Sequence, residues 1–283
     1  MAISLPDILA LKSGPRAFSW DQASSIRYAL GLGYGTDPTD ERQLRFVYEK
    51  GLRAVPTMST VIPWGIGPDR RRMGIDYSKL LHGEQQITIH EPLAAAGEVM
   101  AEAHVSAVYD KGVGKGAVIV TQTTLRDRGE RLVATLTTTL FARADGGFGG
   151  DTSGAPQPHP IPDRAPDVVL ELPTRPEQAL LYRLNGDLNP LHADPGVARA
   201  AGFPQPILHG LCTYGMTCRG VMSAFTDDLP EPIGVHAARF AAPLFPGETL
   251  VLEMWRDGEV VSFRGRSKER DLVVVNNGRT ELR

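Results

Sequence analysis

The segment YRLNGDLNPLH, residues 182–192, gathers side chains that can exchange protons and hold water. Pro190 disfavours a helical conformation for the residue before it, so the chain must turn between Asp187 and His192. Such a turn can bring a carboxylate and an imidazole together around one water, which makes an acid/base pair near neutral pH. The same residue types also build an Asx turn, in which Asp187 or Asn189 caps backbone amides. Both interpretations of this segment stay open at this point.

A long apolar segment follows at residues 207–225, ILHGLCTYGMTCRGVMSAF. Its apolar residues recur at steps of three and four, which predicts a helix packed against a sheet. Gly210 lies near the start of this helix, where a backbone N–H without a side chain in front of it suits a developing oxyanion. An acid/base pair followed by a glycine at a helix start favours an active site over a structural turn.

Strands must position these residues, and the sequence indicates four of them in each half of the chain. The Gly- and Pro-rich stretch at 145–167 cannot enter a sheet or a helix interior, and it separates the halves. The alternating or Val/Thr-rich segments that predict strands are 84–93, 98–112, 116–127, 131–144, 234–245, 248–258, 259–270 and 272–283.

A weak internal sequence repeat suggests that the two halves are copies of one unit. EPLAAAGEVMAEA at 91–103 resembles APLFPGETLVLEM at 242–254. We therefore expect an α+β protein with a double hotdog fold, in which each long antiparallel sheet surrounds a central helix. In the first half residues 52–65 take the place of that helix, and two prolines shorten it, which leaves room for a substrate tail. The expected domains are 1–150 (a first hotdog without a catalytic motif), a linker at 151–167, and 168–283 (a catalytic hotdog).

Composition excludes several other classes of function. The 30 basic and 33 acidic residues are interspersed and give a net charge of −3, so no nucleic-acid-binding face is indicated. The spacing of the two cysteines and seven histidines does not suggest zinc, and we expect no metal. No apolar run approaches the roughly 20 residues that span a bilayer. With few cysteines and no secretory signal, we expect a cytoplasmic protein that does not bind membranes.

The segment YRLNGDLNPLHADPGVARAAGFPQPILHGLCTYG, residues 182–215, resembles the signature of the (R)-specific 2-enoyl-CoA hydratases, also called the hydratase 2 or MaoC-like family. The resemblance extends over nearly the whole chain, in order. YALGLGYGTDP, LRFVYEKGLRAVPT, LLHGEQ, GGFGG and ARFAAPLFPGETL are similar to stretches of the hydratase domain of peroxisomal multifunctional enzyme type 2.

The resemblance implies a specific reaction and site. A trans-2-enoyl-CoA would be hydrated reversibly to a (3R)-3-hydroxyacyl-CoA, without a cofactor, by a homodimer with one active site per chain. Asp187 and His192 would orient and activate the water, Asn189 would lie beside them, and the Gly210 amide would bind the thioester oxygen. The residues that the resemblance places against the acyl-CoA are His82, Gly83, Lys111, Leu188, Pro190, Leu191 and Phe240.

Two other functions fit the same residues less well. A related enzyme of this fold could dehydrate (R)-3-hydroxyacyl thioesters on acyl carrier protein, or hydrolyse a thioester. A non-catalytic acyl-CoA-binding hotdog module would keep the fold and lose the chemistry. The sequence does not distinguish linear, branched, aromatic or steroid acyl groups, and Trp64, Met58 and Met73 are more simply explained as core residues than as a tail pocket.

Overall fold

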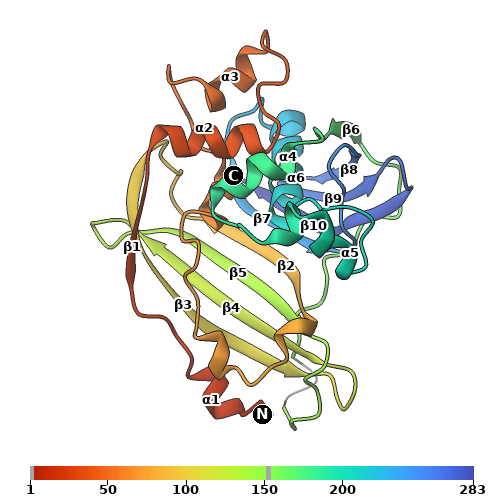
Figure 1. Cartoon of the computed structure of the whole chain (residues 1–283). Coiled ribbons are helices and arrows are strands. Elements are labelled where there is room, and N and C mark those ends of the chain that lie inside the picture. The colour runs from red at the N-terminus through yellow and green to blue at the C-terminus, as the bar shows by residue number, and fades with distance from the viewer. Residues whose placement is uncertain (1–2, 151–153) are drawn as a thin grey trace.

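The computed structural model describes residues 3–150 and 154–283, which contain ten strands in a single antiparallel sheet (Figure 1). Residues 151–153, where the predicted linker begins, lie outside the described part. The strands are β1 (Arg16–Trp20), β2 (Leu80–Ile89), β3 (Gly97–Asp110), β4 (Ala117–Arg126), β5 (Leu132–Ala142), β6 (Val168–Pro173), β7 (Ile233–Phe240), β8 (Thr249–Asp257), β9 (Val260–Ser267) and β10 (Leu272–Leu282).

Apart from the first helix, which precedes β1, the helices lie between the first and second strand of each half. The α-helices are α1 (Leu5–Leu9), α2 (Gln22–Gly31), α3 (Glu41–Val47), α4 (Gln178–Tyr182), α5 (Pro195–Ala200) and α6 (Gly210–Phe225). The 3-10 helices are η1 (Pro56–Thr60), η2 (Arg70–Arg72), η3 (Tyr77–Lys79), η4 (Arg183–Asn185) and η5 (Pro190–His192). No helix among the described residues is long and apolar enough to cross a membrane.

The strand order shows that the chain contains the same unit twice. It runs β1-β3-β4-β5-β2 through the first half and then β7-β10-β9-β8-β6 through the second, so the second half repeats the first in mirror order. The halves join through β2 and β7, which pair antiparallel with Gln86 opposite Ala237. The predicted α+β class and two-copy architecture are therefore confirmed.

All eight predicted strands are present, with bounds that differ by a few residues. The two strands that the sequence did not predict, β1 and β6, have five and six residues and form the two edges of the sheet. Residues 154–167 contain no helix or strand, as their prolines predicted. They are tied to the second half by hydrogen bonds such as that from the Trp255 indole to the Arg164 carbonyl, 2.7 Å long.

Helix α6 fills the inner face of the second half. It begins three residues later than the start of the predicted segment, 207–225, and ten of its sixteen residues are buried. Gly215 and Gly220 allow this packing, because a Cβ at these positions would lie 2.5 Å from Leu32 and 2.4 Å from Leu252. Each fully buried Met or Val side chain of such a helix contributes roughly 1.5–3 kcal/mol to folding.

The first half has only η1 at the corresponding place. Pro56 opens this 3-10 helix, and the hydroxyls of Ser59 and Thr60 bond back to the carbonyls of Pro56 and Thr57. Its five residues are buried and contact α6. A helix this short cannot cover the inner face of its sheet, so space remains between the strands and the chain that follows η1.

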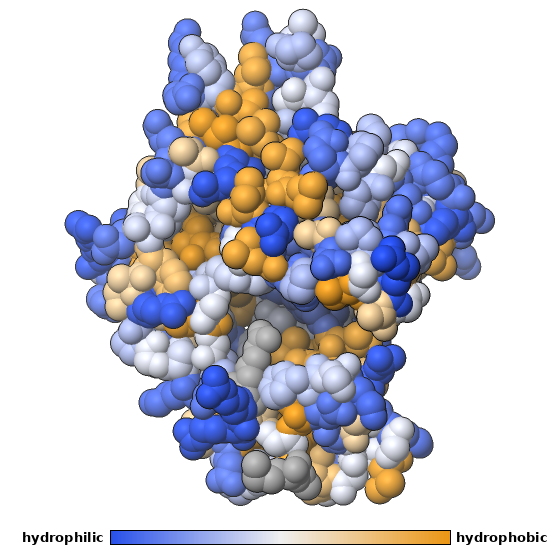
Figure 2. Space-filling model, viewed as in Figure 1, coloured by the Kyte–Doolittle hydropathy of each residue, from blue (hydrophilic) through white to orange (hydrophobic). Residues whose placement is uncertain are grey.

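The surface view shows apolar side chains gathered over α2 and α4 (Figure 2). Three leucines on α4 and the turns after it are more than half exposed: Leu180, Leu184 and Leu188. Exposed apolar groups of this kind often mark contact surfaces.

Candidate active site

The loop from Asp187 to His192 is held in shape by its own side chains. The Asp187 Oδ1 accepts a hydrogen bond from the Asn189 amide, and the Asn189 Oδ1 accepts one from the Leu191 amide, each 3.1 Å long. Pro190 then opens η5, which ends at His192. The Asx turn weighed from the sequence therefore exists. It uses only one oxygen of Asp187, and the other oxygen is left for His192.

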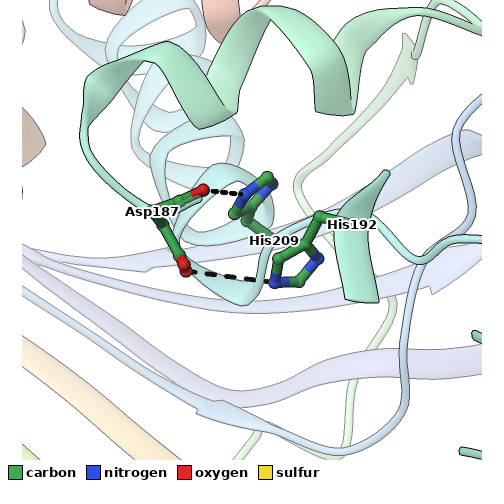
Figure 3. A group of neighbouring side chains, drawn as sticks. All are labelled: Asp187, His192 and His209. Carbon is green, nitrogen blue, oxygen red and sulfur yellow. Dashed lines mark hydrogen bonds and ion pairs between the residues drawn. The ribbon is translucent and has the colours of Figure 1, made fainter. Parts of the chain in front are cut away.

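Asp187 and His192 lie together without touching (Figure 3). The Asp187 Oδ2 is 3.9 Å from the His192 Nε2, while the His192 Nδ1 lies 2.9 Å from the Ile207 carbonyl oxygen. Because a carbonyl only accepts, Nδ1 carries the proton and Nε2 of the neutral ring presents a lone pair towards Asp187. Burial lowers the pKa of His192, which keeps the ring neutral at pH 7. A water between the two atoms could donate one proton to each.

His209 is the third member of this group. Its ring stacks on that of His192 at 3.6 Å between centroids, and its Nε2 donates to the backbone carbonyl of Asp187 at 3.1 Å. The His209 Nδ1 is buried and has no hydrogen-bond partner within the described part of the chain. Burial, and then the neighbouring His192, lower the pKa of His209 to about 3. A permanently neutral ring therefore anchors the loop that carries Asp187.

Gly210 places a backbone donor next to this group. His209 is the N-cap of α6 and makes no side-chain cap, so the first amides of the helix are not capped by it. The Gly210 amide has no acceptor among the residues that the structure describes. A Cβ at this position would lie 3.4 Å from the Phe240 ring, in ordinary van der Waals contact, so the Phe240 ring lies beside the start of the helix.

A cavity of about 680 Å³ connects the loop from Asp187 to His192, the candidate catalytic loop, to the inner face of the first half. Asp187 and Asn189 lie at one side, and Trp64 belongs to the overhanging segment that follows η1. The Trp64 ring also packs on Gly186, where a Cβ would lie 2.8 Å from it. The other lining residues are Thr60, Pro63, Gly65, Ile66, Gly67, Pro68, Leu80, His82, Gln85, Thr123, Leu136, Thr138, Leu140 and Leu211.

The structure brings several predicted contact residues near this cavity. His82 lines it, and the His82 ring meets the Phe240 ring edge-on at 4.9 Å. Gly83 forms a bulge in β2, where a Cβ would lie 3.3 Å from the Thr139 carbonyl oxygen. Lys111 is exposed in the turn after β3 and does not line the cavity.

Three predicted residues lie in the candidate catalytic loop itself. Leu188 and Pro190 are exposed, whereas Leu191 is half-buried. The contacts predicted between all of these residues and an acyl-CoA stay predictions. Two features were not assigned from the sequence: the stacking of His209 on His192, and the overhang that carries Trp64. The HG pair at 209–210 was the available signal for the first.

Asp187, His192 and His209 are close enough to be compared with a metal site, since one candidate ligand atom of each lies within 4.8 Å of the others. The rings of the two histidines are stacked at 23°, so their lone pairs run side by side instead of converging on one point. The Nε2 of His209 and the Nδ1 of His192 are already directed at carbonyl oxygens. This donor set suits proton transfer better than metal coordination.

The sheet is built from two mirrored units, and an acid/base group lies at the start of the only long buried helix in the described part. Together these features define a double hotdog enzyme of the hydratase and dehydratase class. Comparison with known families agrees. Residues 18–144 match the MFE-2 hydratase 2 N-terminal domain, and residues 158–277 match the MaoC like domain.

Individual relatives extend over nearly the whole chain. Enoyl-CoA hydratase ChsH3 of Mycobacterium tuberculosis is 40% identical over 283 residues, which cover 98% of each protein. Peroxisomal multifunctional enzyme type 2 of Mus musculus is 36% identical over 93% of this chain and 36% of its own length. A crystal structure of a MaoC-like dehydratase from Phytophthora capsici superposes with a TM-score of 0.89 at 33% identity, covering 99% of both chains. The chain therefore belongs to the MaoC-like enoyl-CoA hydratase 2 family.

Proposed function

We propose that this enzyme adds water reversibly to trans-2-enoyl-CoA and forms (3R)-3-hydroxyacyl-CoA. The observation that carries the proposal is the 3.9 Å gap between the Asp187 Oδ2 and the His192 Nε2, each of which presents a lone pair. The names of the relatives, enoyl-CoA hydratase among them, support the reaction class.

The proposed mechanism follows from the substrate. A 2-enoyl thioester is electrophilic at C3, because its carbonyl oxygen can take up negative charge. A water held by Asp187 and His192 attacks C3 and gives up one proton to the pair as the C–O bond forms. The charge that develops on the thioester oxygen is stabilised by the Gly210 amide at the start of α6. A proton from the pair then adds to C2, so the net change is the addition of one water across the double bond.

The stereochemistry depends on which face of the double bond meets the water. The acyl chain would enter the cavity of the first half, beneath Trp64, while the CoA moiety extends past His82 and Phe240. That path presents one face of C3 to Asp187 and His192, and the (3R) product is the one that the family relationship favours. Dehydration uses the same path in reverse.

The test is loss of absorbance at the enoyl-thioester band with crotonyl-CoA and trans-2-decenoyl-CoA, coupled to an (R)-specific dehydrogenase. Wild type should consume the band and form (3R) product, whereas Asp187→Asn and His192→Gln should not. Rates measured with the same acyl groups attached to acyl carrier protein show whether the enzyme acts on CoA esters or on carrier-protein esters. Activity that survives both substitutions would show that the site lies elsewhere, and tight ester binding without turnover would favour a non-catalytic module.

We also propose that the protein is a homodimer, as expected from the sequence. The two open sheet edges, β1 and β6, and the exposed leucines over α4 support an assembly with buried surface. Light scattering on the purified chain would show a dimer or contradict it. The cytoplasmic location stays a prediction, and localisation of a tagged full-length chain would test it.

A further inference from the structure

A pair of polar side chains interrupts the apolar inner face of the first half. Gln85 on β2 and Thr138 on β5 lie opposite each other, and the Thr138 hydroxyl donates to the Gln85 Oε1 at 2.9 Å. Gln85 is only 3% exposed, and both residues line the cavity beside the catalytic loop. Inward-facing strand positions in a core are normally apolar, so a polar pair here calls for a reason.

The second half has a polar pair at the corresponding positions, and there the pair is covered by other side chains. Sheet register places His236 of β7 opposite Thr280 of β10, and their side chains are joined at 2.7 Å. Pro92 and Pro243 of the internal sequence repeat are 151 residues apart, and so are Gln85 and His236. Gln85 and His236 therefore occupy corresponding positions in the two halves.

Two groups close the pair in the second half. The Thr217 hydroxyl of α6 lies 3.0 Å from the His236 Nε2, and the Phe263 ring stacks on the histidine at 5.0 Å. As a result, His236 and Thr280 are completely buried.

The first half lacks both of these groups. Only the short helix η1 takes the place of α6, and its Ser59 and Thr60 hydroxyls bond back to their own turn. Register places Thr123 where the second half has Phe263, because Thr123 faces Leu136 on β5 as Phe263 faces Gly278 on β10. Thr123 lines the cavity as well. The polar pair therefore faces open space, and a third hydroxyl stands beside it.

The hydrogen bonds that Gln85 and Thr138 already make determine which ligand groups they can still bind. The Gln85 Nε2 donates to the carbonyls of Gln86 and Thr137, at 3.1 and 3.3 Å, so its protons are used. The Thr138 hydroxyl donates its proton to Gln85, so the lone pairs on its oxygen remain able to accept a hydrogen bond. Thr123 makes no side-chain hydrogen bond within the described residues and can donate. A group that both donates and accepts, an alcohol, matches this set.

We propose that Gln85, Thr138 and Thr123 form a subsite that binds a hydroxyl group carried on the acyl chain of the substrate. The proposal rests on the proposed function, because it takes an acyl-CoA as the occupant of the cavity. The hydroxyl replaces the closure that Thr217 and Phe263 provide in the second half. Unsubstituted chains leave the three polar side chains facing apolar carbon, which costs affinity.

The experiment compares trans-2-decenoyl-CoA with analogues that carry one hydroxyl at successive carbons of the chain. Wild type should prefer one position of the hydroxyl in kcat/KM. Thr123→Val and Thr138→Val, which replace a hydroxyl by a methyl group, should lower that preference about tenfold. Thr124→Val, whose side chain lies on the opposite face of β4, is the matched control and should leave the preference unchanged. Thr123→Val breaks no hydrogen bond of the fold, so it remains informative if Thr138→Val is unstable.

Saturated decanoyl-CoA and its hydroxylated analogues separate this proposal from the proposed function, because calorimetry measures their binding without turnover. Tighter binding of one hydroxylated ester, lost in Thr123→Val, supports the subsite even if no ester is hydrated. Equal losses on plain and hydroxylated esters would overturn the subsite, since the bound group would then belong to the CoA arm or to the reacting water. Absence of any preference in wild type would overturn it too.

Discussion

The two halves share one strand order and differ in what lies against the inner face of the sheet. In the second half the sixteen residues of α6 cover the strands and carry the catalytic glycine candidate at their start. In the first half the five residues of η1 leave a cavity of about 680 Å³. The same architecture thus supports a packed half, which carries Asp187 and His192, and a half that leaves a cavity beside them. Where η1 stands in place of a long helix, the space that α6 fills in the second half is left as a cavity.

The largest expected effect tests whether chemistry is confined to the second half. Asp187→Asn should lower kcat about a thousandfold, because the amide can no longer take up a proton from the water. Asp194→Asn is the control, since the Asp194 carboxylate only caps α5. Steady-state hydration rates measure both variants, and comparable losses in the two would contradict the assignment of Asp187.

The closed and open polar pairs should differ in stability. His236→Ala should lower the free energy of unfolding by roughly 2–4 kcal/mol, because it opens a void and leaves the Thr280 hydroxyl without its hydrogen-bond partner. Gln85 already borders the cavity, so Gln85→Ala should lower the free energy of unfolding by only about 1 kcal/mol. Urea denaturation measures both values, with the half-buried His104→Ala as control. Equal costs at positions 85 and 236 would mean that the first half is as tightly packed as the second.

The second half should also be the acid-sensitive one. Burial lowers the pKa of His236 to about 3, so below pH 6.5 the unfolded chain binds a proton that the folded chain does not. Stability is therefore full above about pH 6.5 and falls as the pH drops towards 3, by about 1.4 kcal/mol per pH unit for one such group. His236→Asn should flatten this slope in urea titrations between pH 7 and 5. An unchanged slope would assign acid sensitivity to other groups.

The smallest effect concerns the overhang of the first half. Trp64→Ala should raise KM for decenoyl-CoA roughly fivefold and leave crotonyl-CoA unaffected, because only a long chain reaches beneath the ring. Tyr48→Ala removes an exposed aromatic side chain that does not line the cavity and is the control. Equal changes with both substrates would mean that Trp64 acts through Gly186 on the catalytic loop.

The sequence predicted the repeated architecture well because its long strands carry clear patterns. Eight strands and the buried helix follow from periodicity and from Pro and Gly. The edge strands β1 and β6 escaped prediction, since five or six residues with one face exposed leave little pattern. The bulge at Gly83 depends on cross-strand register, which no local pattern encodes.

The site was predicted in part for a similar reason. Asp187 and His192 are close in the sequence, and the turn between them is dictated by Asx and Pro chemistry. His209 joins them only because α6 begins beside the loop, a contact across seventeen residues that depends on tertiary packing. The open polar pair became visible only once register had placed Gln85 and His236 at corresponding positions.

The β2–β7 junction has a consequence for how such a chain can be divided. These strands hydrogen-bond along Glu84–Thr88, so the two halves share one continuous sheet without an edge between them. Expressed separately, each half would present β2 or β7 as an unpaired strand and would pair with another copy of itself. The covalent link thus enforces the pairing of two unlike halves, and that pairing places the Asp187–His192 loop beside the cavity of the first half.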